Sequence, residues 1–187
     1  SNSYGGMSSF YALAHNDRFG FSSTCIGDLD DDGVRDLLVG AWGDDDGGVN
    51  AGAIYIFFLT TDGLVKSAQK ISNSYGGLSS FYTLDSSDYF GRSSSSMGDL
   101  DGDGVKDLVV GAYRYDDGGS KAGAVYILTL TTDGLVKSAQ KISNSYGDMS
   151  YSLLTGSYFG GSPAYLGDVD GDGVQDLSVG AVNEDHG

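Results

Sequence analysis

The chain reads Asp28-Leu-Asp-Asp-Asp-Gly-Val-Arg-Asp36 near its beginning, and two later stretches repeat this pattern. They are Asp99-Leu-Asp-Gly-Asp-Gly-Val-Lys-Asp107 and Asp168-Val-Asp-Gly-Asp-Gly-Val-Gln-Asp176. Each places carboxylates at loop positions 1, 3, 5 and 9 and a glycine, which adopts positive φ at little cost, at position 6. Calcium binds roughly six to eight oxygen atoms, and the odd positions of a tightly curled loop face inward together. The sequence therefore predicts one calcium ion in each of the three loops.

The predicted ligands of each ion are four aspartate carboxylates and the backbone carbonyl of the valine at position 7. They are Asp28, Asp30, Asp32, Val34 and Asp36 in the first loop, Asp99, Asp101, Asp103, Val105 and Asp107 in the second, and Asp168, Asp170, Asp172, Val174 and Asp176 in the third. Asp and Gly also dominate turns that bind nothing, for conformational reasons alone. Three copies with the same carboxylate spacing favour a cation site over an ordinary acidic turn.

The same opening begins an EF-hand loop, but the rest of the pattern excludes a helix-loop-helix site. An EF-hand requires a bidentate Glu at position 12, where this chain has Val39, Val110 and Val179. The residues that follow each loop form short apolar runs, such as Leu108-Val-Val-Gly-Ala112, which indicate buried strands. We therefore expect each cation to lie in a strand-loop-strand hairpin.

The whole chain is internally repetitive, because Ser-Asn-Ser-Tyr-Gly begins at Ser1, Ser72 and Ser143. In addition, residues 59–76 are identical to residues 130–147. Such a period indicates stacked structural units of one kind. We predict repeat 1 over residues 1–71, repeat 2 over residues 72–142 and a partial repeat 3 over residues 143–187.

Within a repeat, the pattern predicts four antiparallel strands. In repeat 1, a strand of small residues over 22–26 precedes the cation loop, and an apolar strand ending at Ala41 follows it. The clearest strand signal is Ala53-Ile-Tyr-Ile-Phe-Phe-Leu59, and an Asp-Gly turn then leads to a weaker outer strand over 64–72. One such sheet cannot bury both faces alone, whereas sheets stacked around an axis can. The predicted fold is all-β, with β-propeller-type blades of four antiparallel strands and about two and a half blades in this chain.

These elements together resemble the FG-GAP repeat of integrin alpha-subunit propellers. The resemblance rests on Phe19-Gly20, Gly27 to Gly33, Asp36-Leu-Leu-Val-Gly-Ala41 and Ala51-Gly-Ala-Ile-Tyr-Ile56, and on their counterparts in repeat 2. It implies that the cation loops lie on the lower face of a propeller. It also implies that the loops after Ala41 and Ala112 lie on the upper face, where integrins engage ligands. The repeat is longer than a typical FG-GAP blade, and Asp31 stands where the other two loops have glycine.

The formal net charge of −16 comes largely from the cation loops, which hold 13 of the 26 acidic residues. Three bound calcium ions add six positive charges and would leave a net charge of −10. Such a chain repels nucleic acid and anionic membrane surfaces, so we expect neither as a partner. The acidic tracts Asp44-Asp-Asp46, Asp116-Asp117 and Glu184-Asp185 have no fixed spacing, and we expect them to be solvated loops instead of second cation or ligand sites.

The sequence offers little support for catalysis, and we expect the chain not to be an enzyme. Its two histidines, His15 and His186, have no counterparts in the other repeats, and the Gly-x-Ser-x-Gly motif of hydrolases is absent. Carboxylates that coordinate calcium are not free to move protons.

The expected function is that of a calcium-stabilised, extracellular or cell-surface FG-GAP repeat segment with a structural or adhesive role. Extracellular calcium is high enough to fill sites of roughly 10⁻⁴ to 10⁻³ M affinity. Because the chain stops partway through repeat 3, we expect it to be part of a longer repeat array or filament, with neighbouring copies of itself as partners. A protein or a glycan is the ligand class we expect, if there is one. Two alternatives stay open: a lectin-like propeller that binds glycans between blades, and a non-catalytic propeller attached to an enzyme.

Overall fold

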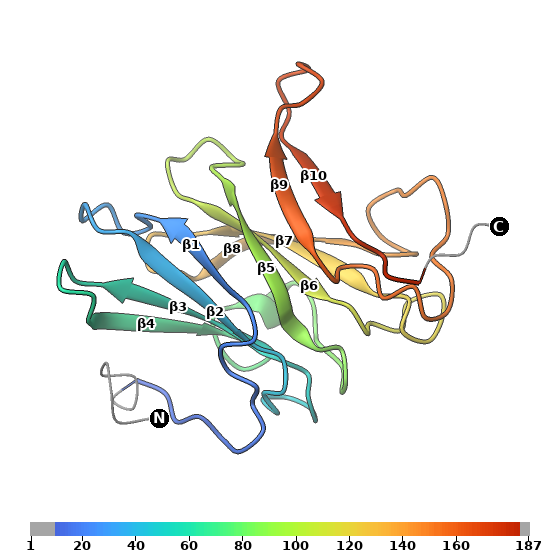
Figure 1. Ribbon diagram of the computed structural model, residues 1–187, viewed down its shortest axis with the longest axis horizontal. Helices are drawn as coiled ribbons and strands as arrows, with labels where there is room; N and C mark the ends of the chain where they lie inside the picture. Colours follow the sequence, from blue (N-terminus) through green and yellow to red (C-terminus); the bar gives the residue numbers. More distant parts are fainter. Residues whose placement is uncertain (1–9, 184–187) are drawn as a thin grey trace.

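The computed structural model describes residues 10–183, which form an all-β structure of three antiparallel sheets (Figure 1). The first sheet has the order β1 (Ser23–Gly27), β2 (Asp36–Ala41), β3 (Ala53–Leu59) and β4 (Val65–Ile71). The second has the order β5 (Phe90–Gly98), β6 (Asp107–Ala112), β7 (Ala124–Leu130) and β8 (Val136–Ile142), while β9 (Pro163–Gly167) pairs with β10 (Asp176–Val179). A short 3-10 helix, η2 (Leu78–Ser80), lies between the first two sheets in the chain. The predicted all-β fold with blades of four antiparallel strands is confirmed, whereas the repeat boundaries stay a prediction.

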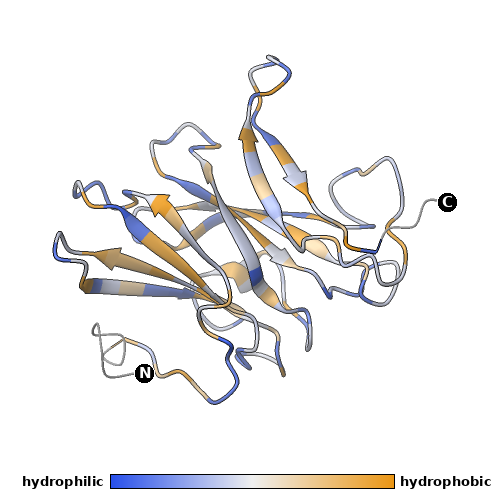
Figure 2. Ribbon diagram, viewed as in Figure 1, coloured by the Kyte–Doolittle hydropathy of each residue, from blue (hydrophilic) through white to orange (hydrophobic). Residues whose placement is uncertain are grey.

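The strand β3 lies inside the first sheet and is buried on both faces. Side chains alternate between the two faces of a strand, and Ile54 and Ile56 belong to the large core that also contains residues of the second sheet. Tyr55 and Phe57 belong to a separate cluster on the other face. Two covered faces explain the continuous apolar run in the sequence, and Figure 2 shows this hydrophobic character along β3.

Neighbouring sheets approach each other closely at a glycine near the end of β2. A Cβ atom added to Gly40 would lie 2.0 Å from the carbonyl oxygen of Gly91, and the hydroxyl of Ser22 donates a hydrogen bond to the same oxygen at 3.0 Å. The second and third sheets meet in the same way, through Gly111 and the carbonyl oxygen of Gly160. Only a residue without a side chain permits such an approach. The sheets therefore stack by one repeated contact.

This stacking separates two ends of the molecule. The cation-loop end consists of residues 28–36, 99–107 and 168–176, which connect β1 to β2, β5 to β6 and β9 to β10 (Figure 1). The opposite end contains residues 42–52 and 113–123, which follow β2 and β6. In the part of the chain that the structure describes, no helix is long and apolar enough to cross a membrane.

Candidate metal centre

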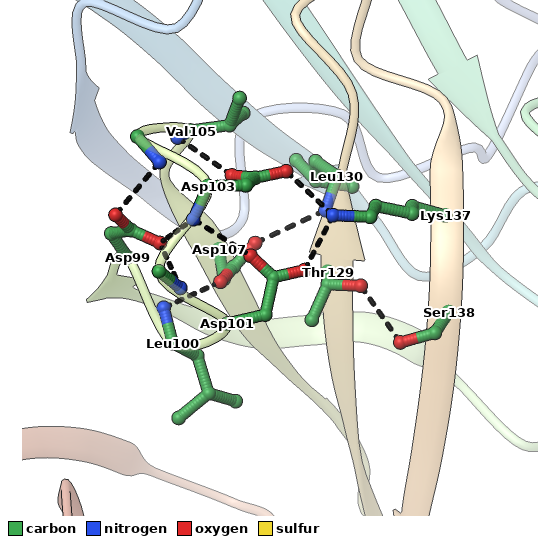
Figure 3. Close-up of polar contacts among 12 residues, drawn as sticks. Asp99, Leu100, Asp101, Asp103, Val105, Asp107, Thr129, Leu130, Lys137 and Ser138 are labelled. Atoms are coloured by element: carbon green, nitrogen blue, oxygen red, sulfur yellow. Dashed lines mark hydrogen bonds and ion pairs between the residues drawn. The ribbon is translucent and has the colours of Figure 1, made fainter.

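The first aspartate of each predicted loop folds the backbone around its own carboxylate. In the second loop, Gly102 and Asp103 donate their N–H groups to Asp99 Oδ1 at 2.8 and 3.1 Å. The N–H of Gly104 reaches Asp99 Oδ2 at 2.8 Å (Figure 3). Gly104 has a φ of 90°, which the tight bend requires and which glycine adopts at little cost. In the first and third loops, the glycine at position 6 donates its N–H to the first aspartate in the same way, Gly33 to Asp28 and Gly173 to Asp168.

The last aspartate of the loop is buried and ties the loop to its own sheet. Leu100 donates its N–H to Asp107 Oδ2 at 2.7 Å, and Leu130 at the end of β7 donates its N–H to Asp107 Oδ1 at 3.1 Å. Asp36 makes the equivalent two bonds in the first loop. Burial raises the pKa of the Asp36 and Asp107 carboxyl groups above its ordinary value, because desolvation disfavours the charged form. These aspartates order the hairpin whether or not an ion is bound.

Three carboxylates in every loop converge closely enough to share one cation. Within each group, one ligand atom of every residue lies within 4.8 Å of the others. The groups are Asp28, Asp30 and Asp32, then Asp99, Asp101 and Asp107, and finally Asp168, Asp170 and Asp176.

The predicted ligands outside these groups lie in the same loops; they are Asp36, Asp103, Asp172 and the carbonyls of Val34, Val105 and Val174. Asp32, Asp103 and Asp172 each accept the N–H of the valine two residues later, at 2.8, 2.8 and 2.7 Å. Among the described residues, the carbonyl oxygens of these valines accept no hydrogen bond, so they are available to a cation. Which of these atoms bind an ion stays a prediction.

A lysine from the last strand of each four-stranded sheet reaches into the loop. Lys66 on β4 lies 2.7 Å from Asp30 Oδ2 and also pairs with Asp32. Lys137 on β8 lies 2.8 Å from Asp101 Oδ2 and 2.6 Å from Asp103 Oδ2 (Figure 3). Hydrogen bonds from these ammonium groups lower the pKa of Asp32 and of Asp103. Sequence reasoning missed both lysines, although the identical segments 59–76 and 130–147 carry them at the same position.

Asp30 shows that a cation fits the first loop despite the lysine. Its Oδ2 atom pairs with Lys66, but its Oδ1 atom is buried and has no hydrogen-bond partner within residues 10–183. A buried oxygen without a donor costs free energy, of order 1–3 kcal/mol. A hard divalent cation would supply the missing partner, since such ions prefer carboxylate and carbonyl oxygens. The donor set of the loop is therefore that of a divalent cation site.

The acidic residues at the opposite end support the fold, so the expectation of a solvated loop is wrong for Asp44. This side chain is only 4% exposed. It accepts the hydroxyl of Tyr55 at 2.9 Å and pairs with the buried ammonium of Lys70 at 3.0 Å. Its neighbour Asp46 accepts a hydrogen bond from Ser72. Glu184 and Asp185 lie outside the described residues.

Of the two histidines, only His15 lies among the described residues, and it belongs to none of the three carboxylate groups. His15 is exposed, and His186 lies outside the described residues. The three carboxylate groups are the only clusters of potential metal-binding residues in the range 10–183.

Known proteins match the segments that contain these loops. The family model of the FG-GAP repeat matches residues 20–57 and 91–128. Each range runs through a cation loop to the third strand of its sheet.

Three curated proteins are similar to most of the chain. Integrin alpha-4 of Xenopus laevis is 30% identical over 174 residues, which are 88% of this chain and 14% of that protein. Integrin alpha-5 of Xenopus laevis is 34% identical over 89% of this chain and 15% of its own length. Integrin alpha-11 of Homo sapiens is 36% identical over 88% of this chain and 12% of its own length. The chain thus spans about one seventh of the length of the first two relatives.

Proposed function

Because the chain carries FG-GAP repeats similar to those of integrin alpha subunits, we propose that it is a calcium-stabilised segment of an adhesion-related β-propeller. The observation that supports calcium is the buried Oδ1 atom of Asp30, which has no hydrogen-bond partner among residues 10–183 and lies in a loop whose carboxylates converge. We further propose that the segment works outside the cell or at its surface. There, calcium is abundant enough for loops of weak affinity, of roughly 10⁻⁴ to 10⁻³ M.

Calcium suits these loops better than magnesium does. Calcium accepts roughly six to eight oxygen ligands in flexible geometry, whereas magnesium demands a near-ideal octahedron and keeps several waters. The loop offers carboxylates and a valine carbonyl at mixed positions along a curved backbone, which favours the less demanding ion. When bound, the ion would neutralise the crowded carboxylates and hold the two strands of the hairpin together. Asp99, Asp101 and Asp107 would hold it in the second loop.

The role we propose is structural or adhesive, in a longer array of the same repeat. The support is the contact between sheets, because Gly40 meets Gly91 in the same manner as Gly111 meets Gly160. A contact that repeats along the chain can be repeated again by further units, within one chain or between neighbouring copies. We propose no catalysis, since the described loop carboxylates are engaged by lysines and backbone donors.

A titration of the chain with calcium, monitored by isothermal titration calorimetry, tests this proposal. We expect saturable binding of three ions per chain, with affinities of roughly 10⁻⁴ to 10⁻³ M. Asp101→Asn should remove one ion and leave the other two. The matched control is Asp148→Asn, which makes the same change of charge at an exposed position between β8 and β9 and should leave all three ions bound. Absence of saturable binding, or three ions in Asp101→Asn, would contradict the proposal.

A further inference from the structure

Arginines gather on aromatic rings at the opposite end of the molecule, away from the cation loops. Three of the four arginines in the sequence lie there, and each guanidinium stands over a ring. Arg92 is 3.6 Å from the ring centre of Phe21, Arg114 is 4.7 Å from that of Tyr89, and Arg18 is 5.7 Å from that of Trp42. A planar guanidinium that stacks in this way keeps its N–H edge free for a planar oxyanion. The fourth arginine, in the first cation loop, is exposed.

Two of these rings, Trp42 and Tyr89, belong to a continuous row of aromatic rings across the three sheets. Trp42 and Tyr89 have ring centres 4.5 Å apart, Tyr89 and Tyr113 lie 5.8 Å apart, and Tyr113 and Tyr158 lie 5.5 Å apart. Trp42 and Tyr113 follow β2 and β6, whereas Tyr89 and Tyr158 come shortly before β5 and β9. The row therefore depends on the stacking of the sheets, which fixes its rings relative to one another.

Among the described residues, these arginines form no ion pair with an acidic side chain. Within residues 10–183, every ion pair uses a lysine, although the sequence has 26 acidic residues. In the same range, the Arg92 side chain donates no hydrogen bond. Arg114 donates from Nη1 to the hydroxyl of Tyr89 at 3.0 Å, but its Nε atom is buried and has no partner in this range. A guanidinium has five N–H donors, so most donors of both residues are available to a ligand.

A cavity of about 320 Å³ opens beside these two arginines. It is lined by Arg92, Tyr113, Arg114, Tyr158, Val182 and Asn183. The lining combines two guanidinium groups, two phenol rings, an amide and one apolar side chain. Binding cavities for small molecules have volumes of roughly 300–1,000 Å³, so this one has room for a single ring of a sugar and its substituents.

We propose that this cavity binds a sugar unit that carries one carboxylate, such as a uronate. The guanidinium of Arg92 or Arg114 would take the carboxylate in a bidentate pair. The ring of Tyr158 would pack against the apolar C–H face of the sugar ring, and Asn183 would bond a hydroxyl. Tyr113 supports Arg92, whose guanidinium lies 5.2 Å from the centre of its ring. No structural feature of the cation loops enters this site.

The charge of the chain favours a single carboxylate over a polyanion. At long range, the net charge of −16 repels an acidic polymer. Salt screens the attraction of the two arginines at that distance, so they do not offset the repulsion. One carboxylate that enters the cavity meets both guanidinium groups at close range, where the local attraction dominates. The aromatic wall favours a sugar ring over the flexible side chain of an acidic peptide, because the C–H face of a ring can pack against an aromatic surface.

The test compares glucuronate with glucose, which differ at one carbon, by NMR titration of the chain in calcium-containing buffer. We expect saturable binding of glucuronate and at least tenfold weaker binding of glucose. Arg92→Gln and Arg114→Gln should each weaken glucuronate binding at least tenfold. Arg35→Gln, the same substitution at the arginine in the first cation loop, is the matched control and should change it less than twofold.

Four results would overturn the proposal. They are equal binding of glucose and glucuronate, unchanged binding by Arg92→Gln, equal binding of acetate, and tighter binding of a glutamate-rich peptide. Arg114 also bonds Tyr89, so its variant could lose structure; the comparison of ligands on the unmodified chain then decides the question. A negative result leaves the calcium proposal intact, because the cation loops lie at the other end.

Discussion

Asp107 accepts a hydrogen bond at 3.1 Å from the backbone N–H of Leu130, which lies 23 residues further along the chain. This bond links the end of the second cation loop, where β6 begins, to the end of β7. The strands β6 and β7 are neighbours in the sheet. The loop is thus fastened to the sheet by its own last carboxylate. The same link joins Asp36 to Leu59 in the first sheet.

Asp107→Asn should destabilise the chain by about 1–3 kcal/mol, since one acceptor becomes an amide donor that faces an N–H group in a buried place. Urea unfolding in the presence of chelator measures this effect without any contribution from bound calcium. Asp148→Asn at the exposed position between β8 and β9 serves as the control and should change the free energy of unfolding by less than about 0.5 kcal/mol. Equal stability of the two variants would show that the bond to Leu130 contributes little.

Gly40→Ala should destabilise the chain severely, by at least about 3 kcal/mol, because the new methyl group collides with the neighbouring sheet. Its Cβ atom would lie 2.0 Å from the carbonyl oxygen of Gly91. Gly180 occupies the same position in the third repeat, and a Cβ atom there would have no neighbour closer than 3.8 Å. Gly180→Ala is therefore the control, with an expected change below about 1 kcal/mol. Thermal unfolding of both variants decides whether this contact determines the stacking.

Asp88 should make the stability fall as the pH rises from about 4 to about 7. Burial raises the pKa of this carboxyl group to about 7, so the folded state keeps a proton that the unfolded state loses near pH 4. Stability is therefore greatest below the unfolded pKa and falls until the pH exceeds the folded pKa.

Asp88→Asn should match the unmodified chain at low pH and be more stable than it above about pH 8. The amide oxygen can still accept the N–H of Asp85, which now donates to Asp88 Oδ2 at 2.7 Å. Denaturant unfolding of both proteins over this pH range, in chelator, makes the comparison. If the difference in stability between Asp88→Asn and the unmodified chain does not vary with pH, the pKa of Asp88 is not raised in the folded state.

Lys137→Met should strengthen calcium binding to the second loop. The ammonium of Lys137 lies within 2.8 Å of carboxylate oxygens on both Asp101 and Asp103. There its positive charge repels a calcium ion that binds the same carboxylates. At low salt we expect an increase in affinity of about tenfold, and a smaller one at physiological salt. Lys121→Met makes the same change of charge away from the loops and should leave the affinity unchanged. Weaker binding by Lys137→Met would mean that the lysine helps to form the site.

The fold could be predicted from the sequence because its signals are local and repeated. The apolar run of β3, the Asp-Gly turn after it and the three carboxylate loops each lie within a few residues. The lysines in the loops escaped prediction because Lys66 is 34 residues from Asp32 and meets it only after the sheet has formed. The sequence predicts a solvated Asp44 because its partners Tyr55 and Lys70 lie on other strands and nothing local points to them.

The row of aromatic rings could not be predicted for a related reason. Trp42, Tyr89 and Tyr158 come from three different repeats, and no pattern within one repeat places them together. Their proximity follows from the way sheets stack at Gly40 and Gly111. A sequence period indicates that units stack but does not specify which side chains meet at the interface between neighbouring sheets.

Thermal unfolding with and without calcium tests the central claim most directly. An ion that binds only the folded state stabilises that state, so chelation should lower the melting temperature and added calcium should restore it. Magnesium at the same concentration should restore less. Identical melting curves in chelator and in millimolar calcium would contradict the account.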